Sequence, residues 1–334
     1  MKALMLSGPR DLKLVDAPSV PLKPGQVRLR ISKVGICGSD YSSIAGKLPF
    51  TRFPIIPGHE AAGVVMEVCG GDSAWKPGDR AAIHPILCDR NDPMFAAGRV
   101  HHSDTTEVLG VVSRNGAYAE EVVLEDYMLR AVPEGVSDEA AAMIEPVDVA
   151  VRALRRGELQ KGERVLVLGA GNIGLLVVQA ARALGAGYVA VTDLVPDKLR
   201  RAKELGVDET FDVREGLPAE KIEKQFDLVI DGVGNEASVK DALLACRRGG
   251  RIVVYGVPSG DINFALRGAF SKDVSLMTSR LYDASFDEAM GLVASGAVRT
   301  TDIITHRVQL EDAPALIERI LDGKEQSIKV MISV

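Results

Sequence analysis

Cysteine is scarce in this sequence of 334 residues: its four copies are scattered, and no two stand in C-x-x-C spacing. This argues against a disulfide framework and favours a reducing compartment. The sequence also lacks an excess of basic residues, with 40 Lys and Arg against 46 Asp and Glu. The resulting net charge of −6 argues against a surface that binds nucleic acid. Blocks of like charge, internal repeats and low-complexity segments are also lacking. With 46% apolar and 26% charged residues, we expect a soluble globular protein without a nucleic-acid partner.

The sequence contains no apolar run that would span a membrane. The most apolar stretch, residues 165–181, is interrupted by glycines, Asn172 and Gln179, and it divides into a strand and a helix. The apolar run at the N-terminus ends after a few residues, at Ser-Gly-Pro-Arg, which is too short for a signal peptide. We therefore expect a cytoplasmic protein that does not associate with membranes.

The strongest motif is Gly-Ala-Gly-Asn-Ile-Gly at residues 169–174, which matches G-x-G-x-x-G. It follows a continuous apolar run at 165–168, which is typical of a buried parallel strand. It opens a helix expected over about 173–184, and a second strand-like run then ends in Asp193. A strand–turn–helix–strand unit with an acid about 20 residues after the glycines is the pattern of a dinucleotide site.

Each glycine of this motif has a physical role. We expect Gly169 to permit the tight turn, Gly171 to let the backbone approach a pyrophosphate, and Gly174 to let helix and strand pack closely. Free N–H groups at the helix start would hold the phosphates. An ordinary βα turn with packing glycines is the weaker alternative, because all four elements are in register. The expected cofactor-binding residues are Gly169, Gly171, Asn172, Ile173, Gly174 and Asp193.

Asp193 also predicts which cofactor binds. Its carboxylate should accept hydrogen bonds from the adenosine ribose and repel the extra phosphate of NADP. Leu194 offers no compensating cation, and Arg200 and Arg201 lie about two turns into the next helix. The sequence therefore predicts NAD rather than NADP.

The pattern of elements changes near residue 147. Before it, short strand-like runs alternate with Gly and Pro signals, which indicates an antiparallel barrel-like or sandwich domain with long loops. After it, helical and strand patterns alternate, which predicts a doubly wound parallel sheet. The expected fold class is α/β, with a β-rich domain joined to a Rossmann domain.

The β-rich part carries the candidate chemistry. Cys37 lies in a glycine-flanked loop, His59 and Glu60 follow Pro-Gly, and Glu145 stands at the expected domain junction. Cys, His and Glu are ligands of a catalytic zinc that keeps one position open. Each residue by itself also has an ordinary explanation: a small buried side chain, a hydrogen-bonded loop histidine, or a charge at a helix start.

Taken together, these motifs resemble the zinc-dependent medium-chain dehydrogenases, in the branch of sorbitol, threonine and sugar-acid dehydrogenases. The resemblance covers the whole chain, from Gly-Ile-Cys-Gly-Ser-Asp at 35–40 to Ile-Thr-His-Arg at 304–307. It implies a GroES-like catalytic domain of residues 1–146 and 281–334. It also implies an NAD-binding Rossmann domain of residues 147–280.

The resemblance assigns the metal site. Cys37, His59 and Glu145 match the family's zinc positions. Glu60 matches a carboxylate that can replace or alternate with the third of these. The choice between Glu60 and Glu145 as direct ligand stays open.

The resemblance also implies residues around the metal. Asp40 matches the acid expected to orient His59, and Ser39 matches the hydroxyl that hydrogen-bonds the substrate alcohol. Ser42 stands where the branch often has a histidine, so what completes the proton relay is open. Arg280 could bind a substrate carboxylate or phosphate, or could equally form an ion pair at an interface.

The sequence departs from the family at the lobe that usually binds a structural zinc. Four cysteines in C-x2-C-x2-C-x7-C spacing are replaced by Asp89, Asp92, Phe95 and Ser103, and Cys88 is one residue out of register. A structural zinc prefers four N or S donors, so we expect a single, catalytic zinc per subunit. The lobe would then be ordered by packing, for example of Phe95 and Met94, or be mobile.

The resulting hypothesis is an NAD-dependent zinc dehydrogenase of the EC 1.1.1 type. It would transfer hydride between NAD and a secondary alcohol such as a polyol or sugar acid. One alternative is a zinc-free quinone or enoyl reductase of the same superfamily, and another is a non-catalytic dinucleotide-binding protein. A bare sheet edge is expected at residues 274–277, and exposed edges are normally covered. The resemblance implies that this edge pairs with its copy across a two-fold axis, so we expect a homodimer or homotetramer.

Overall fold

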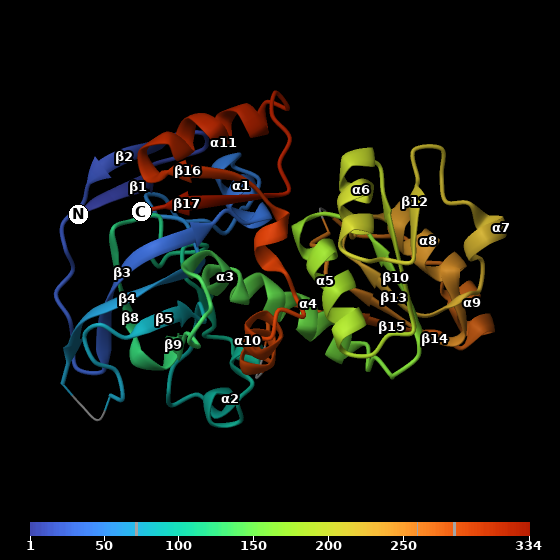
Figure 1. Ribbon diagram of the computed structural model, residues 1–334, viewed down its shortest axis with the longest axis horizontal. Helices are drawn as coiled ribbons and strands as arrows, with labels where there is room; N and C mark the ends of the chain where they lie inside the picture. The colour runs from blue at the N-terminus through green and yellow to red at the C-terminus, as the bar shows by residue number, and fades with distance from the viewer. Residues whose placement is uncertain (71–72, 259, 283–284) are drawn as a thin grey trace. The chain divides into compact units, whose positions relative to one another are not determined.

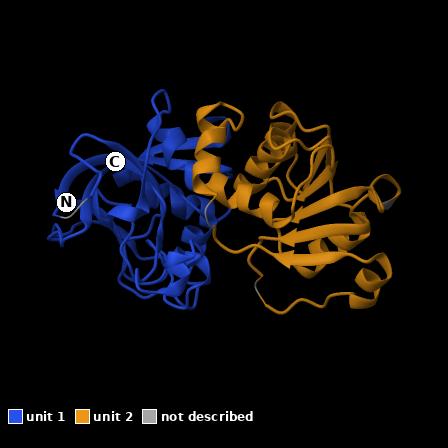
Figure 2. Cartoon of the chain, turned by 90° about the horizontal axis from the view of Figure 1, so that it is seen from below, with its two compact units in different colours: residues 1–145, 300–334 blue, residues 146–299 orange. Residues whose placement is uncertain are grey.

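The computed structural model describes residues 1–70, 73–258, 260–282 and 285–334. The chain forms two compact units, shown in Figure 2: residues 1–145 with 300–334, and residues 146–299. Among the described residues, no helix is both long enough and apolar enough to cross a membrane.

The first unit is built on a seven-stranded sheet in the order β16-β17-β3-β4-β5-β9, with β8 pairing β3 (Figure 1). All its strand pairs are antiparallel except β16 with β17. The elements of this unit are β1 (Lys2–Leu6), β2 (Leu12–Asp16), β3 (Gln26–Gly35), α1 (Gly38–Ile44), β4 (Glu60–Cys69), β5 (Arg80–Ile83), β6 (Ile86–Leu87), α2 (Pro93–Ala96), η1 (Val100–His102), β7 (Glu107–Val108), β8 (Glu121–Glu125), η2 (Asp126–Met128), β9 (Leu129–Ala131), α3 (Asp138–Ala142), η3 (Thr300–Ile303), β16 (Ile304–Gln309), η4 (Leu310–Asp312), α11 (Ala313–Leu321) and β17 (Lys329–Ser333).

Alternation along β3 and β4 explains how this sheet forms. Val27, Leu29 and Ile31 are buried in one apolar core, while the residues between them are polar. The same core includes Val65 of β4 and Ile317 of α11, so the C-terminal segment is part of this unit's interior. The GroES-like β-rich domain expected from the sequence is confirmed.

The second unit contains a six-stranded parallel sheet in the order β12-β11-β10-β13-β14-β15. The order 3-2-1-4-5-6 is that of a Rossmann fold, and the expected doubly wound sheet is confirmed. Its elements are β10 (Arg164–Leu168), α5 (Asn172–Ala183), β11 (Tyr188–Asp193), α6 (Pro196–Glu204), β12 (Glu209–Asp212), α7 (Ala219–Ile222), β13 (Phe226–Asp231), α8 (Glu236–Ala245), β14 (Cys246–Val254), α9 (Leu266–Lys272), β15 (Ser275–Thr278) and α10 (Phe286–Ala294). Helix α4 (Ile144–Arg156) contains the boundary between the units.

The return of the chain to the first unit comes at residue 300, later than the residue 281 expected from the sequence. Helix α10 belongs to the second unit, where Glu288 binds Arg155 of α4 and Ser285 donates a hydrogen bond to Asp148. The periodicity of a helix predicts that it has an apolar face but does not show which unit that helix contacts. This is the physical reason why the boundary expected at residue 281 differs from the observed one at residue 300.

Candidate metal centre and nucleotide site

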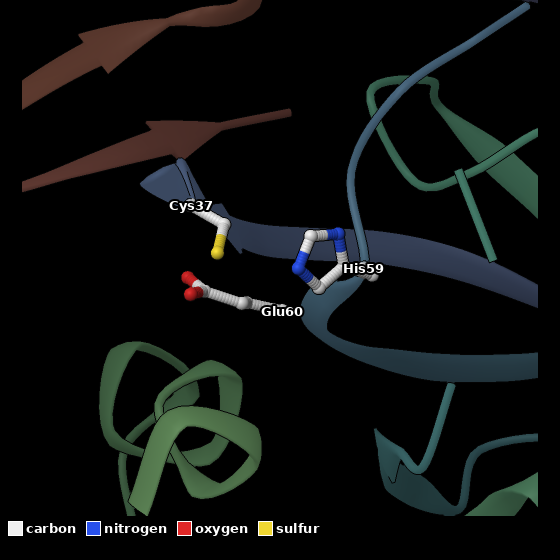
Figure 3. A group of neighbouring side chains, drawn as sticks. All are labelled: Cys37, His59 and Glu60. Atoms are coloured by element: carbon white, nitrogen blue, oxygen red, sulfur yellow. The ribbon is translucent and has the colours of Figure 1, made fainter. Parts of the chain in front are cut away.

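Three of the expected zinc ligands lie together in the first unit. The ligand atoms of Cys37, His59 and Glu60 are all within 4.8 Å of one another, and Figure 3 shows the side chains pointing toward one another. The pairing of β3 with β4 explains this proximity, because Gly35 lies opposite Glu60 in the register. Cys37 follows two residues after β3 ends, so its thiol reaches the start of β4.

The donor groups fit a zinc ion. Sulfur, imidazole nitrogen and carboxylate oxygen are its usual protein ligands, and three of them leave a position for substrate. The Oε1 atom of Glu60 is buried and has no hydrogen-bond partner in the described structure, so a cation would satisfy it. Among the described residues, this is the one group of three such side chains close enough to hold a metal.

Asp40 lies behind His59 and is fully buried. Its Oδ1 atom is the carboxylate oxygen that faces His59 Nδ1, at 3.7 Å, which is within ion-pair range of a protonated imidazole but longer than a hydrogen bond. Burial raises the pKa of Asp40, against the opposing effect of His59 and of donors to the carboxylate. Burial lowers the pKa of His59, but the acidic groups of Asp40 and Cys37 outweigh it and hold that pKa well above 6.5. Zinc binds the neutral imidazole, so protonation of His59 and metal binding compete.

Lys329 is a buried cation beside the candidate metal centre that sequence reasoning missed. Its ammonium is completely buried at the start of β17, where it forms an ion pair with Glu60 Oε2 and donates to the carbonyl of Ile36 at 3.0 Å. Gly35 leaves room for this pair, because a Cβ there would collide with the Glu60 carboxylate. A lysine next to the apolar run 330–332 was the available signal, since a cation in such a strand needs a buried acid.

Glu145 is buried in the first turn of α4, but it is not part of the group formed by Cys37, His59 and Glu60. Its charge helps to raise the pKa of His59. The structure therefore places Glu60, rather than Glu145, beside the other two expected ligands. Direct coordination by Glu145 stays a prediction.

The remaining expected residues around the metal and substrate are more dispersed. Ser39 lies half-buried in the first turn of α1, two residues after Cys37. Ser42, which replaces the relay histidine of the branch, donates its hydroxyl to the Gly38 carbonyl at 3.0 Å. Arg280 is exposed in the second unit, two residues beyond β15. Its role toward substrate stays a prediction.

The lobe without structural-zinc cysteines is held by side-chain contacts. The carboxylate of Asp92 accepts hydrogen bonds from Met94 N at 2.7 Å and from Ser103 Oγ at 2.6 Å. The ring of Phe95 packs edge-on against Tyr127, with 5.0 Å between centroids. These contacts account for an ordered lobe, and they occupy the Asp92 carboxylate that a metal would need.

The expected nucleotide site lies at the switch point between β10 and β13. Gly169 has a φ of +95°, and its N–H donates to the Thr192 carbonyl at 3.0 Å. A Cβ on Gly174 would collide with the Gly169 carbonyl, whereas a Cβ on Gly171 would meet open space. The amide oxygen of Asn172 is buried without a hydrogen-bond partner at the start of α5. These features fit a pyrophosphate at the helix start.

Asp193 ends β11, as the sequence predicts, and its two oxygens accept from Ala170 N at 2.8 Å and Val195 N at 2.9 Å. Lys198 is a nearby cation that sequence reasoning missed, with its Nζ 4.0 Å from the Asp193 carboxylate. Arg200 and Arg201 both form ion pairs with acids of their own helix. The pairs are Arg200 with Asp197 and Glu204, and Arg201 with Glu204.

Two family models match the chain. Residues 23–134 match the alcohol dehydrogenase GroES-like domain, and residues 172–295 match the zinc-binding dehydrogenase domain. These two ranges fall respectively on the unit that contains Cys37 and His59 and on the unit that contains the glycine turn.

Known relatives align over almost the whole chain. Sorbitol dehydrogenase of Homo sapiens is 33% identical, and the alignment covers 99% of this chain and 95% of that protein. Sorbitol dehydrogenase of Bacillus subtilis is 30% identical, with coverages of 99% and 97%.

Solved structures are similar over the same length. One is described as a short chain alcohol dehydrogenase of Escherichia coli CFT073 complexed with NADH; it is 28% identical, with a TM-score of 0.92 and coverages of 100% and 99%. Another is a putative zinc-binding dehydrogenase of Sinorhizobium meliloti bound to NADP, 26% identical, with the same TM-score and coverages. Since the matches extend over both units, this chain belongs to the zinc-binding medium-chain dehydrogenase family.

Proposed function

We propose that this protein is an NAD-dependent zinc dehydrogenase that interconverts a secondary alcohol, such as a polyol or sugar acid, and the corresponding carbonyl compound. The convergence of Cys37, His59 and Glu60 carries the proposal, because these ligands would be unnecessary in a zinc-free reductase. The sorbitol dehydrogenases among the relatives support the substrate class. Four free cysteines are compatible with the proposed cytoplasmic location.

Different residues of the chain would bind the metal, transfer the proton and bind the cofactor. A zinc ion held by Cys37, His59 and Glu60 supplies Lewis acidity that makes a substrate hydroxyl more acidic. Ser39 receives the hydroxyl proton and passes it outward, since its side chain is only half-buried. Asp40 keeps His59 in the orientation needed for binding. The glycine turn and Asp193 of the second unit would hold NAD, which would supply the hydride acceptor.

A spectrophotometric screen tests this function. The protein, loaded with zinc, is offered polyols, aldonates, secondary alcohols and threonine together with NAD, and NADH formation is followed. We expect turnover with at least one member of the polyol or sugar-acid group. Turnover only of quinones or enoyl compounds without zinc would favour the reductase alternative. Zinc and nucleotide binding without any turnover would favour a non-catalytic role.

Cofactor preference is expected to depend on Asp193. We expect the Asp193→Ser variant to lose preference for NAD by at least about tenfold, because a hydrogen bond to a charged group contributes about 1.5–3 kcal/mol. The substitution also leaves Lys198 without its nearby acid and able to attract a 2′-phosphate. The measurement is the ratio of kcat/KM values for NAD and NADP.

Asp212→Ser is the matched control for cofactor preference. It removes the same charge at the end of β12, in register with Asp193, from a carboxylate bound to Arg214. We expect it to leave the ratio nearly unchanged. A wild-type protein that uses NADP as well as NAD would contradict the assignment of NAD.

We further propose a dimer or tetramer. Strand β15 forms the edge of its sheet, and large apolar side chains are exposed nearby along the chain. They are Val257, Leu266, Phe270 and Leu276. Pairing this edge with its copy across a two-fold axis would cover both the backbone and the apolar side chains.

Light scattering at micromolar concentration is expected to show this assembly. Phe270→Asp should shift the protein toward monomer, because Phe270 is 86% exposed and a charge there would be buried on pairing. Phe50→Asp, at an exposed phenylalanine of the first unit, should leave the mass unchanged. A monomeric wild-type protein would contradict the proposal.

A further inference from the structure

Tyr118 contacts the segment that follows Cys37 and the segment that precedes His59, although it lies about 60 residues beyond His59 in the chain. It is fully buried in the segment between β7 and β8. Its hydroxyl donates to Asp40 Oδ2 at 2.7 Å, and its backbone N–H donates to the Pro57 carbonyl at 3.0 Å. One residue therefore links the loop that bears Cys37 with the loop that bears His59.

The hydroxyl acts on one particular oxygen of Asp40. Oδ2 accepts two hydrogen bonds, from Tyr118 and from the Cys37 N–H at 2.9 Å. Oδ1 is left to face His59 Nδ1. With Nδ1 directed at Asp40, the other ring nitrogen of His59 is the one available to a metal.

The ring of Tyr118 acts on the loop before His59. Gly58 has a φ of +97°, and a Cβ there would collide with the Tyr118 ring. Two further hydrogen bonds join the same segments, from Gly116 N to the Ile56 carbonyl at 2.6 Å and from Ala117 N to the Gly58 carbonyl at 2.8 Å. The segment 116–118 thus pairs with 56–58 and fixes the backbone that leads directly into His59.

We propose that Tyr118 is a positioning residue of the zinc site: its hydroxyl fixes the rotation of the Asp40 carboxylate, which fixes the orientation of His59. This inference rests on the proposed function, since it requires zinc at Cys37, His59 and Glu60. It predicts that the hydroxyl contributes to metal affinity without touching the metal. The Tyr118 ring and the backbone hydrogen bonds between segments 116–118 and 56–58 hold the two segments together. A phenylalanine at position 118 would keep both of these contributions.

The test is Tyr118→Phe in the full chain, with zinc affinity measured by competition against a chromogenic chelator. We expect the zinc Kd to rise about 10- to 100-fold, the usual effect of removing a partner behind a metal ligand. Tyr127→Phe is the matched control. It removes a hydroxyl that donates to the Cys88 carbonyl at 3.0 Å in the same unit, away from Asp40. The control should bind zinc as tightly as the wild type.

Two further readouts separate positioning from general stability. Cobalt(II) substituted for zinc should give a shifted visible spectrum in Tyr118→Phe and an unshifted one in Tyr127→Phe, because the spectrum reports ligand geometry. In an Asp40→Ala background, Tyr118→Phe should change the zinc Kd by less than about twofold. The reason is that the Tyr118 hydroxyl acts on His59 only through the Asp40 carboxylate, which this background already lacks.

The outcomes distinguish the inference from the function. Wild-type affinity and an unshifted cobalt spectrum in Tyr118→Phe would overturn the inference while leaving the zinc site intact. Equal effects in the presence and absence of Asp40 would overturn it as well. A wild-type protein that binds no zinc would overturn the proposed function and this inference together.

Discussion

Replacing Cys37 with alanine is expected to remove the bound zinc and to lower kcat/KM by at least about a thousandfold. Lewis-acid catalysis contributes several kcal/mol to transition-state stabilisation, and each 1.36 kcal/mol is a factor of ten. Cys37 supplies the only thiol among the three grouped ligands, and Sγ is the donor that zinc prefers over magnesium or calcium. The remaining His59 and Glu60 would form a two-ligand site too weak to retain the metal.

Elemental analysis after dialysis measures this effect directly. We expect one zinc per wild-type chain and none in Cys37→Ala. Cys88→Ala is the informative control: Cys88 is buried in the lobe, where its Sγ lies 3.9 Å from Thr105 Oγ1 and 3.6 Å from the Asp89 carbonyl. It should retain the zinc and the activity. Two tightly held zinc ions in the wild type would show that the lobe binds metal despite its lost cysteines.

Lys329→Met is expected to destabilise the protein stripped of zinc by about 3–5 kcal/mol, since removal of one partner leaves a buried charge uncompensated. Both Lys329 and Glu60 have side chains that are 0% exposed, so water cannot replace the lost partner. The measurement is the free energy of unfolding in urea, with a chelator present. Added zinc should offset part of the loss, because a cation beside Glu60 restores the missing positive charge.

A second substitution tests the cause of this destabilisation. Glu60→Gln combined with Lys329→Met removes both charges, and we expect it to recover stability relative to Lys329→Met while weakening zinc binding. Lys324→Met is the control on the same C-terminal segment. Its partner is Asp322 in an exposed pair, so we expect a change of less than about 1 kcal/mol. A loss in Lys329→Met as small as in this control would contradict the importance of the buried pair.

The local structure of the expected nucleotide site was largely predictable from the sequence because its parts are contiguous. The turn, the helix start and the acid at the end of β11 lie within 25 residues, and local geometry determines their arrangement. Gly169 requires a positive φ, and Gly174 has no room for a side chain, so both are specified by the backbone itself. The alternation of helices and strands likewise indicated the parallel sheet, because it reflects local periodicity.

The metal centre was only partly predictable, since its neighbours come from distant segments. The sequence indicated Cys37 and His59, yet it left Glu60 and Glu145 as equal candidates for the third ligand. The register of β3 with β4 places Gly35 opposite Glu60 and thereby brings Glu60 beside Cys37, while direct coordination by either carboxylate stays a prediction. Register depends on pairing across a sheet, which a single strand's pattern does not contain.

The sequence by itself determined the candidate ligand types, the glycine turn and the acid at the end of β11, because those properties belong to single residues or short segments. Only the tertiary structure decided what surrounds the metal centre. Lys329 reaches Glu60 because β17 pairs with β3 across nearly 300 residues of chain, and Tyr118 reaches Asp40 because its segment pairs with the loop before His59. Burial then makes these contacts strong, since a charge or a hydroxyl removed from water must find its partner within the fold.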